Sequence, residues 1–168
     1  MSDPRITEWF KAVDTDNSGR INASELVKAL HSAGLDISVA FAGTLIRMFD
    51  DQRQGRLGLV QFENMHKWIM SVRQHFLRFD ADASRSLSYH EISQALQSAG
   101  FNVDPTPFSE LCKTFDPDCT GTLSMSGYLG LCVLLQQASK VFGEYDSQRM
   151  GRIGLDFNQF LYCAALVR

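Results

Sequence analysis

A stretch of twelve residues, Asp14 to Glu25, constrains the fold more than any other part of the sequence, because it carries side-chain oxygens at regular intervals. Asp14, Asp16 and Ser18 stand at its positions 1, 3 and 5, and Glu25 at position 12 adds a carboxylate with two oxygens. Gly19 at position 6 permits the positive φ that a sharp reversal of the chain requires. Such a turn gathers the oxygens around one point, and a hard divalent cation prefers about six to eight oxygen ligands.

This spacing is that of the EF-hand calcium loop, in which position 7 contributes its backbone carbonyl and position 9 binds directly or through water. The predicted calcium ligands of this first loop are therefore Asp14, Asp16, Ser18, Arg20, Asn22 and Glu25. A polar turn that merely precedes a helix is the alternative interpretation. The apolar Ile21 at position 8, and the recurrence of the whole unit along the chain, favour the calcium loop.

The unit recurs, giving loops one to five, which begin at Asp14, Asp50, Asp80, Asp116 and Asp146 and are separated by 36, 30, 36 and 30 residues. The longer spacing leaves room for two helices and a linker. The shorter spacing leaves room for only one continuous helix of roughly 28 Å. Position 8 is apolar in every loop, which predicts short β contacts between paired loops; these residues are Ile21, Leu57, Leu87, Leu123 and Ile153.

The pattern as a whole predicts an all-α fold built from five EF-hands. Eight helices are expected near residues 4–13, 23–33, 38–49, 59–79, 89–99, 105–115, 125–145 and 157–166. Residues 1–168 are expected to form a single domain, with hands near 4–34, 38–70, 68–100, 105–137 and 134–168.

Loop three keeps a full set of oxygen ligands but departs from the pattern at one position. Its ligands are predicted to be Asp80, Asp82, Ser84, Ser86, Ser88 and Glu91. Arg85 occupies position 6, where glycine is expected. A positive φ at a non-glycine residue costs on the order of 1 kcal/mol, so we expect weaker binding in this loop rather than none.

The remaining loops have fewer ligands. Loop four offers Asp116, Asp118, Thr120 and Thr122, but Gly127 at position 12 removes the bidentate acid and predicts a weak site. Loops two and five are expected to be structural, because loop two has one carboxylate among its ligand positions and loop five has the soft sulfur of Met150 at position 5. The sequence therefore predicts two Ca²⁺ sites and a third, weak one.

Composition narrows the class of protein. With 168 residues, 45% hydrophobic content and a net charge of -3, the chain has no basic surplus for a nucleic-acid partner. The segment Met1–Arg5 has no signal-peptide core, so we expect a cytoplasmic protein with free thiols: Cys112, Cys132 and Cys163 on helix faces in the core, and Cys119 in a loop. No phosphate-binding glycine loop, H-E-x-x-H or nucleophile elbow occurs, so an enzyme is not expected.

Five hands leave one without a partner if loops one and two pair and loops three and four pair. The fifth hand then exposes apolar residues that require cover, and a second fifth hand would supply it by a two-fold contact. The predicted dimer interface comprises Ile153, Phe157, Phe160 and Leu161.

At this point the chain resembles the penta-EF-hand family over nearly its whole length. The specific marks are the 36/30 alternation and a stretched fifth loop: Leu26 and Ile92 directly follow position 12 of their loops, whereas the matching Phe160 falls at position 15. The resemblance implies the fold and dimerisation through hand five, with the same chain or with another penta-EF-hand chain. This chain departs from the family by lacking a long Gly/Pro-rich N-terminal segment and by carrying Arg85, so peripheral membrane association is left open.

The leading functional hypothesis is a calcium sensor or adaptor that uncovers an apolar groove for a partner protein or peptide. The candidate groove residues are Met65, Trp68, Ile69 and Val72, for each of which a plain core role is the alternative. Two further hypotheses are a regulatory subunit of a calcium-dependent, calpain-like enzyme and a passive calcium buffer.

Overall fold

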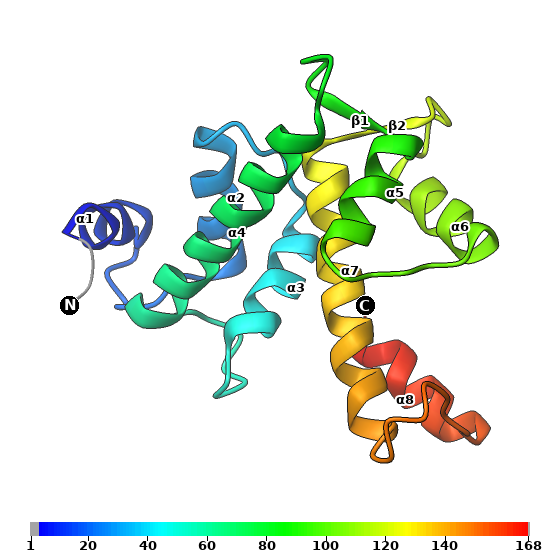
Figure 1. Cartoon of the computed structure of the whole chain (residues 1–168). Coiled ribbons are helices and arrows are strands. Elements are labelled where there is room, and N and C mark those ends of the chain that lie inside the picture. Colours follow the sequence, from blue (N-terminus) through cyan, green and yellow to red (C-terminus); the bar gives the residue numbers. More distant parts are fainter. Residues whose placement is uncertain (1–3, 168) are drawn as a thin grey trace.

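The computed structural model describes residues 4–167, which contain eight α-helices and two short strands (Figure 1). The helices are α1 (Pro4–Val13), α2 (Ala23–Ser32), α3 (Val39–Phe49), α4 (Leu59–Phe79), α5 (Tyr89–Ser98), α6 (Pro105–Phe115), α7 (Met125–Tyr145) and α8 (Phe157–Val167). The strands are β1 (Ser86–Ser88) and β2 (Thr122–Ser124). The predicted all-α EF-hand fold is confirmed, and α4 and α7 are the two continuous helices required by the shorter spacing.

The loop residues themselves start the helices that follow them. Asn22 caps α2, because its side chain accepts a hydrogen bond from the N–H of Glu25, and the Glu25 carboxylate accepts one from the N–H of Asn22. Ser88 and Glu91 form the same reciprocal cap at α5. Each cap satisfies two N–H groups that a helix start otherwise leaves without partners. The predicted ligands at positions 9 and 12 are thus also the residues that begin the exit helix.

The position 8 residues pair the loops two by two. Ile21 and Leu57 exchange backbone hydrogen bonds of 2.8 and 2.9 Å, and Leu87 lies opposite Leu123 in the antiparallel β1–β2 ladder. Both predicted pairings are therefore confirmed. Ile153 of loop five has no strand or bridge partner within residues 4–167.

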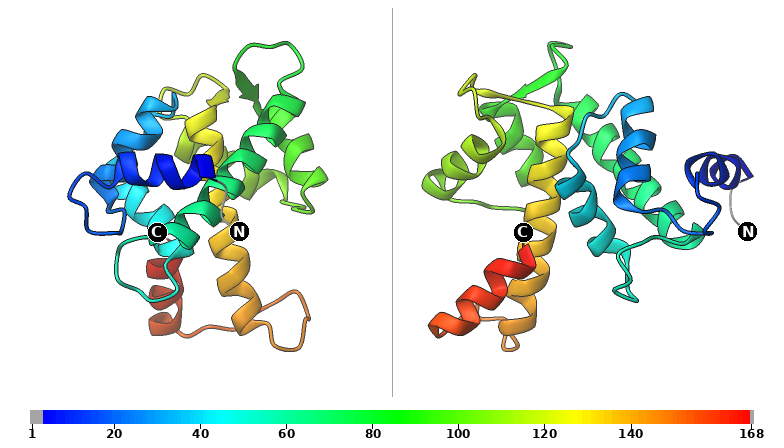
Figure 2. Two further views of the ribbon diagram at one scale, coloured as in Figure 1. Left: turned by 90° about the vertical axis from the view of Figure 1, so that its left-hand side faces the viewer. Right: turned by 180° about the vertical axis from the view of Figure 1, so that it is seen from behind.

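Helix α7 runs through the middle of the molecule, between the first two hands and the third and fourth (Figures 1 and 2). Its N-terminal part joins the main core, where Phe62, Leu45, Tyr128 and Leu129 are fully buried. Its C-terminal part extends beyond this core and carries α8, which packs on α7 and lies apart from the other helices (Figure 2). No helix in the described range has the length and apolar character needed to cross a bilayer.

The residues predicted for a partner groove lie in or against this core. Met65, Ile69 and Val72 are buried, and the half-buried Trp68 packs on Phe49 with ring centroids 6.0 Å apart. In the conformation described here these side chains therefore do not line an open surface.

Candidate calcium-binding loops

All five loops share one backbone conformation. Residues at position 4 have φ between 51° and 55°, and those at position 6 have φ between 65° and 77°, Arg85 included. In each loop the N–H of position 6 donates to the aspartate at position 1, over distances of 2.6 to 3.1 Å. The turn therefore forms whatever ligands the loop carries, and the loops differ in their side chains.

Loop one brings three carboxylates together. Oxygen atoms of Asp14, Asp16 and Glu25 all lie within 4.8 Å of one another. Asp14 is only 7% exposed and Glu25 only 3%. Burying two carboxylates so close together is costly unless a cation or hydrogen-bond donors compensate them, and the exposed Asp16 adds a third negative charge. The residues therefore fit a hard divalent cation, which would be held by these oxygens and by those of Ser18, Arg20 and Asn22.

Hydrogen bonds lower the pKa values of two acids of loop one, Glu25 and Asp16. Burial raises the pKa of Glu25, but the N–H of Asn22 and the hydroxyl and N–H of Thr15 outweigh it and hold the pKa below its usual value. The hydroxyl and N–H of Ser18 lower the pKa of Asp16. Both carboxylates are thus in the charged form that a cation requires.

Loop three repeats this arrangement with more exposed acids. The N–H and hydroxyl of Ser88 bond to one oxygen of Glu91, and the other accepts a longer bond of 3.4 Å from the N–H of Ala81. Ser84 lowers the pKa of Asp82, and Ser88 lowers that of Glu91. Among the described residues, Asp80, Asp82 and Glu91 do not close to the mutual 4.8 Å found in loop one. Loop three is therefore less preformed.

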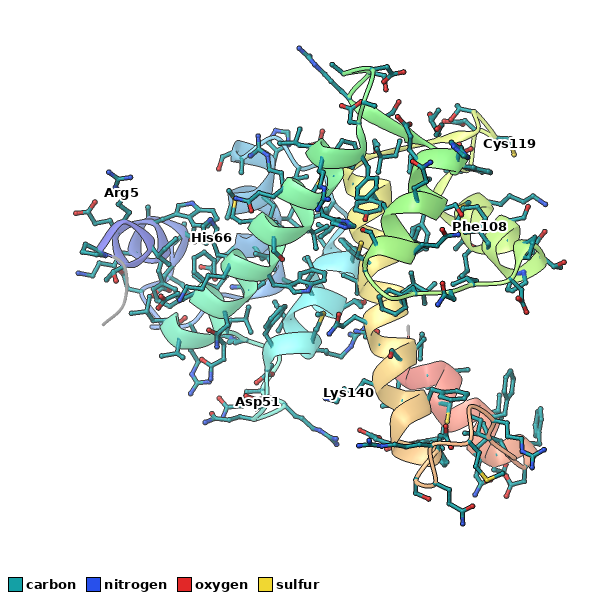
Figure 3. The ribbon with its side chains drawn as sticks, in the orientation of Figure 1. Arg5, Asp51, His66, Phe108, Cys119 and Lys140 are labelled. Atoms are coloured by element: carbon teal, nitrogen blue, oxygen red, sulfur yellow. The ribbon has the colours of Figure 1, made fainter. Side chains whose placement is uncertain are left out.

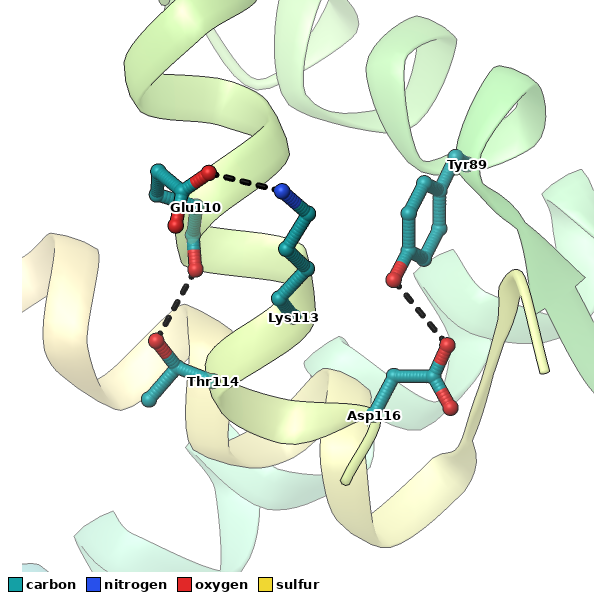
Figure 4. Close-up of polar contacts among 5 residues, drawn as sticks. All are labelled: Tyr89, Glu110, Lys113, Thr114 and Asp116. Atoms are coloured by element: carbon teal, nitrogen blue, oxygen red, sulfur yellow. Dashed lines mark hydrogen bonds and ion pairs between the residues drawn. The ribbon is translucent and has the colours of Figure 1, made fainter. Parts of the chain in front are cut away.

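Loop four has a buried first ligand that is held from outside the loop. The hydroxyl of Tyr89, on α5, donates to Asp116 Oδ2 at 3.0 Å (Figure 4). Burial and this hydrogen bond raise the pKa of Tyr89 to about 12, so the phenol remains a donor at neutral pH. This contact was not predictable from the sequence, because the two residues lie 27 positions apart and no spacing rule connects them.

A side chain at position 12 of loop four, where the chain has Gly127, would be crowded by the end of α6. A Cβ atom there would come to 3.1 Å from the carbonyl oxygen of Phe115. Within α6, Lys113 donates to the carboxylate of Glu110, and the hydroxyl of Thr114 donates to the Glu110 backbone carbonyl (Figure 4).

Loop five is longer than the others. Helix α8 begins eleven residues after Asp146, whereas α2 begins nine residues after Asp14. Asp156 and Gln159 form the reciprocal cap that starts α8, with bonds of 3.0 and 2.9 Å. The later helix start agrees with the two-residue insertion inferred from the sequence, and the capping pair contains an amide where loops one and three have glutamate.

The helix of hand five presents an apolar face to solvent. Phe157 is 72% exposed, Phe160 57% and Leu161 49%. Tyr162 and Leu166 are exposed as well, while Cys163 is buried. Such a run of large apolar side chains on one short helix typically marks an interaction surface.

Comparison with known proteins places the chain among EF-hand proteins. A family model described as an EF-hand domain pair matches residues 3–67. Peflin from Homo sapiens is 31% identical over 165 residues, covering 97% of this chain and 58% of that protein; sorcin from Mus musculus is 26% identical, covering 95% and 81%. The solved structure of a homologue of programmed cell death 6 protein from Leishmania major Friedlin has 33% identity and a TM-score of 0.75, covering 97% of this chain and 94% of that one. The chain belongs to the penta-EF-hand family.

Membership in the penta-EF-hand family makes calcium the ion to test in these loops, since EF-hand domains bind Ca²⁺. The chain spans about 60% of the length of the peflins it matches, so the activity of those longer proteins is not transferred to it. The cysteines of this penta-EF-hand chain are free thiols: Cys112 and Cys163 are buried, Cys132 is half-buried, and Cys119 projects from loop four (Figure 3).

Proposed function

We propose that this penta-EF-hand protein is a calcium-responsive adaptor that binds two ions, in loops one and three, and dimerises through hand five. The observation that carries the proposal is the cluster of Asp14, Asp16 and Glu25 in loop one, whose oxygens lie within 4.8 Å of one another and of which Asp14 and Glu25 are buried. Loop three is the second site. Loop four, with Asp116, Asp118, Thr120 and the carbonyl of Thr122, is a third and weaker one.

The dimer proposal is supported by the unpaired fifth loop and by the exposed face of α8. Each of the first four loops has a partner loop at position 8, whereas Ile153 has none among the described residues. A second copy of hand five would pair Ile153 with its equivalent and cover Phe157, Phe160 and Leu161. A different penta-EF-hand chain offers the same complement, so a heterodimer is the second candidate.

The groove part of the proposal requires helices to move. Met65, Ile69 and Val72 are buried here, and Trp68 is half-buried against Phe49. Calcium in loop one would draw Glu25 toward the ion and shift α2 relative to its neighbours, which is the opening movement typical of sensor EF-hands. A buffer would bind ions without this movement.

The decisive experiment is a calorimetric calcium titration of the wild-type chain and of Glu25→Gln. A glutamine at position 12 still serves as the helix cap of α2, so the fold is retained while the bidentate carboxylate is removed. We expect two sites in the wild type, and in the variant a loss of affinity at one site of at least about tenfold. Glu110→Gln, an exposed acid on α6, is the matched control. Unchanged binding in Glu25→Gln would contradict the assignment of the ligands.

Exposure of the groove is measured in the same titration by dye binding and by tryptophan fluorescence. Trp9 packs on Phe62 and would contribute its own signal, so the Trp9→Phe variant isolates Trp68. A calcium-dependent rise in dye binding with a change at Trp68 supports the adaptor. Ion binding with neither change would favour the passive calcium buffer. If the purified chain stays monomeric in the absence of other proteins, the heterodimer is favoured.

A further inference from the structure

A cleft of about 180 Å³ lies where the two pairs of hands meet. The linker after α2 forms one wall, the C-terminal half of α4 another, and the start of α7 and loop three complete it. The residues that decide its chemistry are Leu35, Arg73, Phe76, Leu77, Arg85 and Met125. None of these six residues is a predicted side-chain ligand for calcium, whereas Asp80, which also lines the cleft, is the first predicted ligand of loop three.

Two guanidinium groups line this cleft. Arg73, on α4, and Arg85, in loop three, are exposed, and neither side chain has a recorded hydrogen bond or ion pair with any residue in 4–167. Asp80 also borders the cleft, but its two oxygens already accept hydrogen bonds from the N–H groups of Ser84 and Arg85. The two guanidinium groups outnumber the single carboxylate, so the lining of the cleft carries a net positive charge of one.

The backbone at Arg85 is strained, which adds an independent observation. Its φ is 65°, and the other four loops have glycine at this position. A non-glycine residue in this region costs on the order of 1 kcal/mol, and such strain is found where a side chain has a function. At this position a glycine would leave the cleft with one guanidinium instead of two. Loop three thus has an arginine that lines the cleft at the position where the other four loops have glycine.

The size and floor of the cleft indicate its occupant. Ligand pockets for small molecules have volumes of roughly 300–1,000 Å³, so this cleft suits a single side chain better than a whole cofactor. Leu35 and Phe76 give it a buried apolar floor, and Leu77 forms an exposed apolar rim. We propose that this cleft binds an acidic peptide segment of a partner protein, with an aliphatic side chain on the floor and flanking carboxylates on Arg73 and Arg85. Guanidinium groups bind carboxylates through paired, charge-assisted hydrogen bonds.

The cleft is physically joined to loop three. The N–H of Arg85 donates to Asp80 Oδ2 at 3.1 Å, and Asp80 is the first predicted ligand of that loop. A peptide that holds Arg85 in place therefore favours the loop conformation that binds calcium. This coupling rests on the proposed calcium site in loop three, and by thermodynamic reciprocity calcium must strengthen peptide binding by the same factor.

The test uses a fluorescein-labelled peptide with Glu-Leu-Glu in a Gly/Ser background, and a matched peptide with Gln-Leu-Gln. Fluorescence anisotropy is measured first in a calcium chelator. We expect the acidic peptide to bind at least about tenfold more tightly than the amide peptide, and Arg73→Gln and Arg85→Gln each to lose about tenfold. Arg78→Gln, an exposed arginine of α4 that does not line the cleft, should lose nothing. Equal binding of both peptides, or an equal loss in Arg78→Gln, overturns the proposal.

Two further measurements test the coupling between peptide and calcium and the alternative that the cleft binds a lipid surface. Tighter peptide binding in calcium that Glu91→Gln abolishes supports the coupling, and identical affinities with and without calcium overturn it. A calcium titration without peptide shows whether the proposed calcium sites bind ions. This result is independent of whether the cleft binds the peptide in a calcium chelator. Binding to phosphatidylserine vesicles that Arg73→Gln and Arg85→Gln abolish, without any binding of the peptide, would overturn the peptide as occupant.

Discussion

At the scale of single residues, position 6 separates loop three from the other loops, since Arg85 adopts a positive φ that glycine adopts at little cost. Arg85→Gly should remove backbone strain of about 1 kcal/mol. The share of this strain that arises when calcium orders the loop opposes binding, so its removal should raise the calcium affinity of loop three a few-fold. The measurement is calorimetry in a Glu25→Gln background, where loop one is weakened and loop three is expected to be the strongest remaining site. Arg85→Ala is the control, because it removes the side chain but keeps the strain. An equal gain in both variants would refute strain as the cause.

Position 12 of loop four is a second single-residue determinant. Gly127→Glu should supply the missing bidentate carboxylate and raise the number of bound ions by one. The new Cβ lies 3.1 Å from the Phe115 carbonyl oxygen, so a small loss of stability without calcium is expected as well. Titration stoichiometry is the readout, with Gly127→Gln as the uncharged control. A third ion that binds equally well to the Gln variant would show that the carboxylate is not the missing ligand.

At the scale of elements, two of the three glycines of α7 have opposite surroundings. A Cβ at Gly130 would approach the Phe115 ring to 2.7 Å, whereas a Cβ at Gly143 would meet nothing within 4 Å. Gly143→Ala should stabilise the helix by about 0.5–1 kcal/mol, because alanine is the better helix former. Gly130→Ala should instead destabilise the protein by roughly 1–3 kcal/mol through overpacking. Urea unfolding of the two variants measures both changes in the free energy of unfolding. A Gly130→Ala variant more stable than the wild type would contradict the close approach of α6 to α7.

His75 on α4 joins this helix to α5 and α7. Its Nδ1 lies 2.8 Å from the hydroxyl of Tyr128 on α7, and its Nε2 lies 2.9 Å from the hydroxyl of Ser98 on α5. Burial and the nearby charge of Arg78 lower the pKa of His75. The unfolded chain therefore binds a proton at this residue more readily than the folded chain, so stability is present above the unfolded pKa of about 6.5 and falls as the pH drops below it.

The corresponding prediction is a loss of stability between pH 7.5 and 5.5 that depends on His75. His75→Gln should lose less over this interval, because its side chain does not titrate. His90→Gln removes an exposed histidine of α5 and serves as the control. Urea midpoints at the two pH values provide the measurement, and parallel losses in wild type and His75→Gln would exclude this histidine as the source.

The elements were predictable where they depend on repetition and local chemistry. Every helix lies within about one residue of its expected bounds, because loop spacing fixes where helices fit and residues such as Asn22 and Ser88 cap them locally. The bond from Tyr89 to Asp116 and the contact of His75 with Tyr128, across 53 residues, were not predictable. Such contacts depend on how helices pack, and a single sequence without variation gives no distance information about them.

At the scale of the whole molecule, an odd number of hands leaves one surface unsatisfied. Loops one to four pair within the chain, and α8 stands apart on the extension of α7 with its apolar face in solvent (Figure 1). A chain that ends before Asp146 removes that surface and should not dimerise, but it also strips cover from the end of α7. A point substitution on the exposed face of α8 is therefore the sharper test of assembly.

Phe160→Glu places a charge on the predicted two-fold interface, where it would face the equivalent residue of a second copy. The side chain is 57% exposed in the single chain, so the substitution should leave the fold intact and act only on assembly. We expect the wild type to sediment as a dimer at micromolar concentration and the variant as a monomer with an unchanged circular dichroism spectrum. Val60→Glu changes an exposed apolar residue of α4 and should remain dimeric. A dimeric Phe160→Glu would exclude α8 as the interface, because two buried, unpaired carboxylates facing each other cost several kcal/mol.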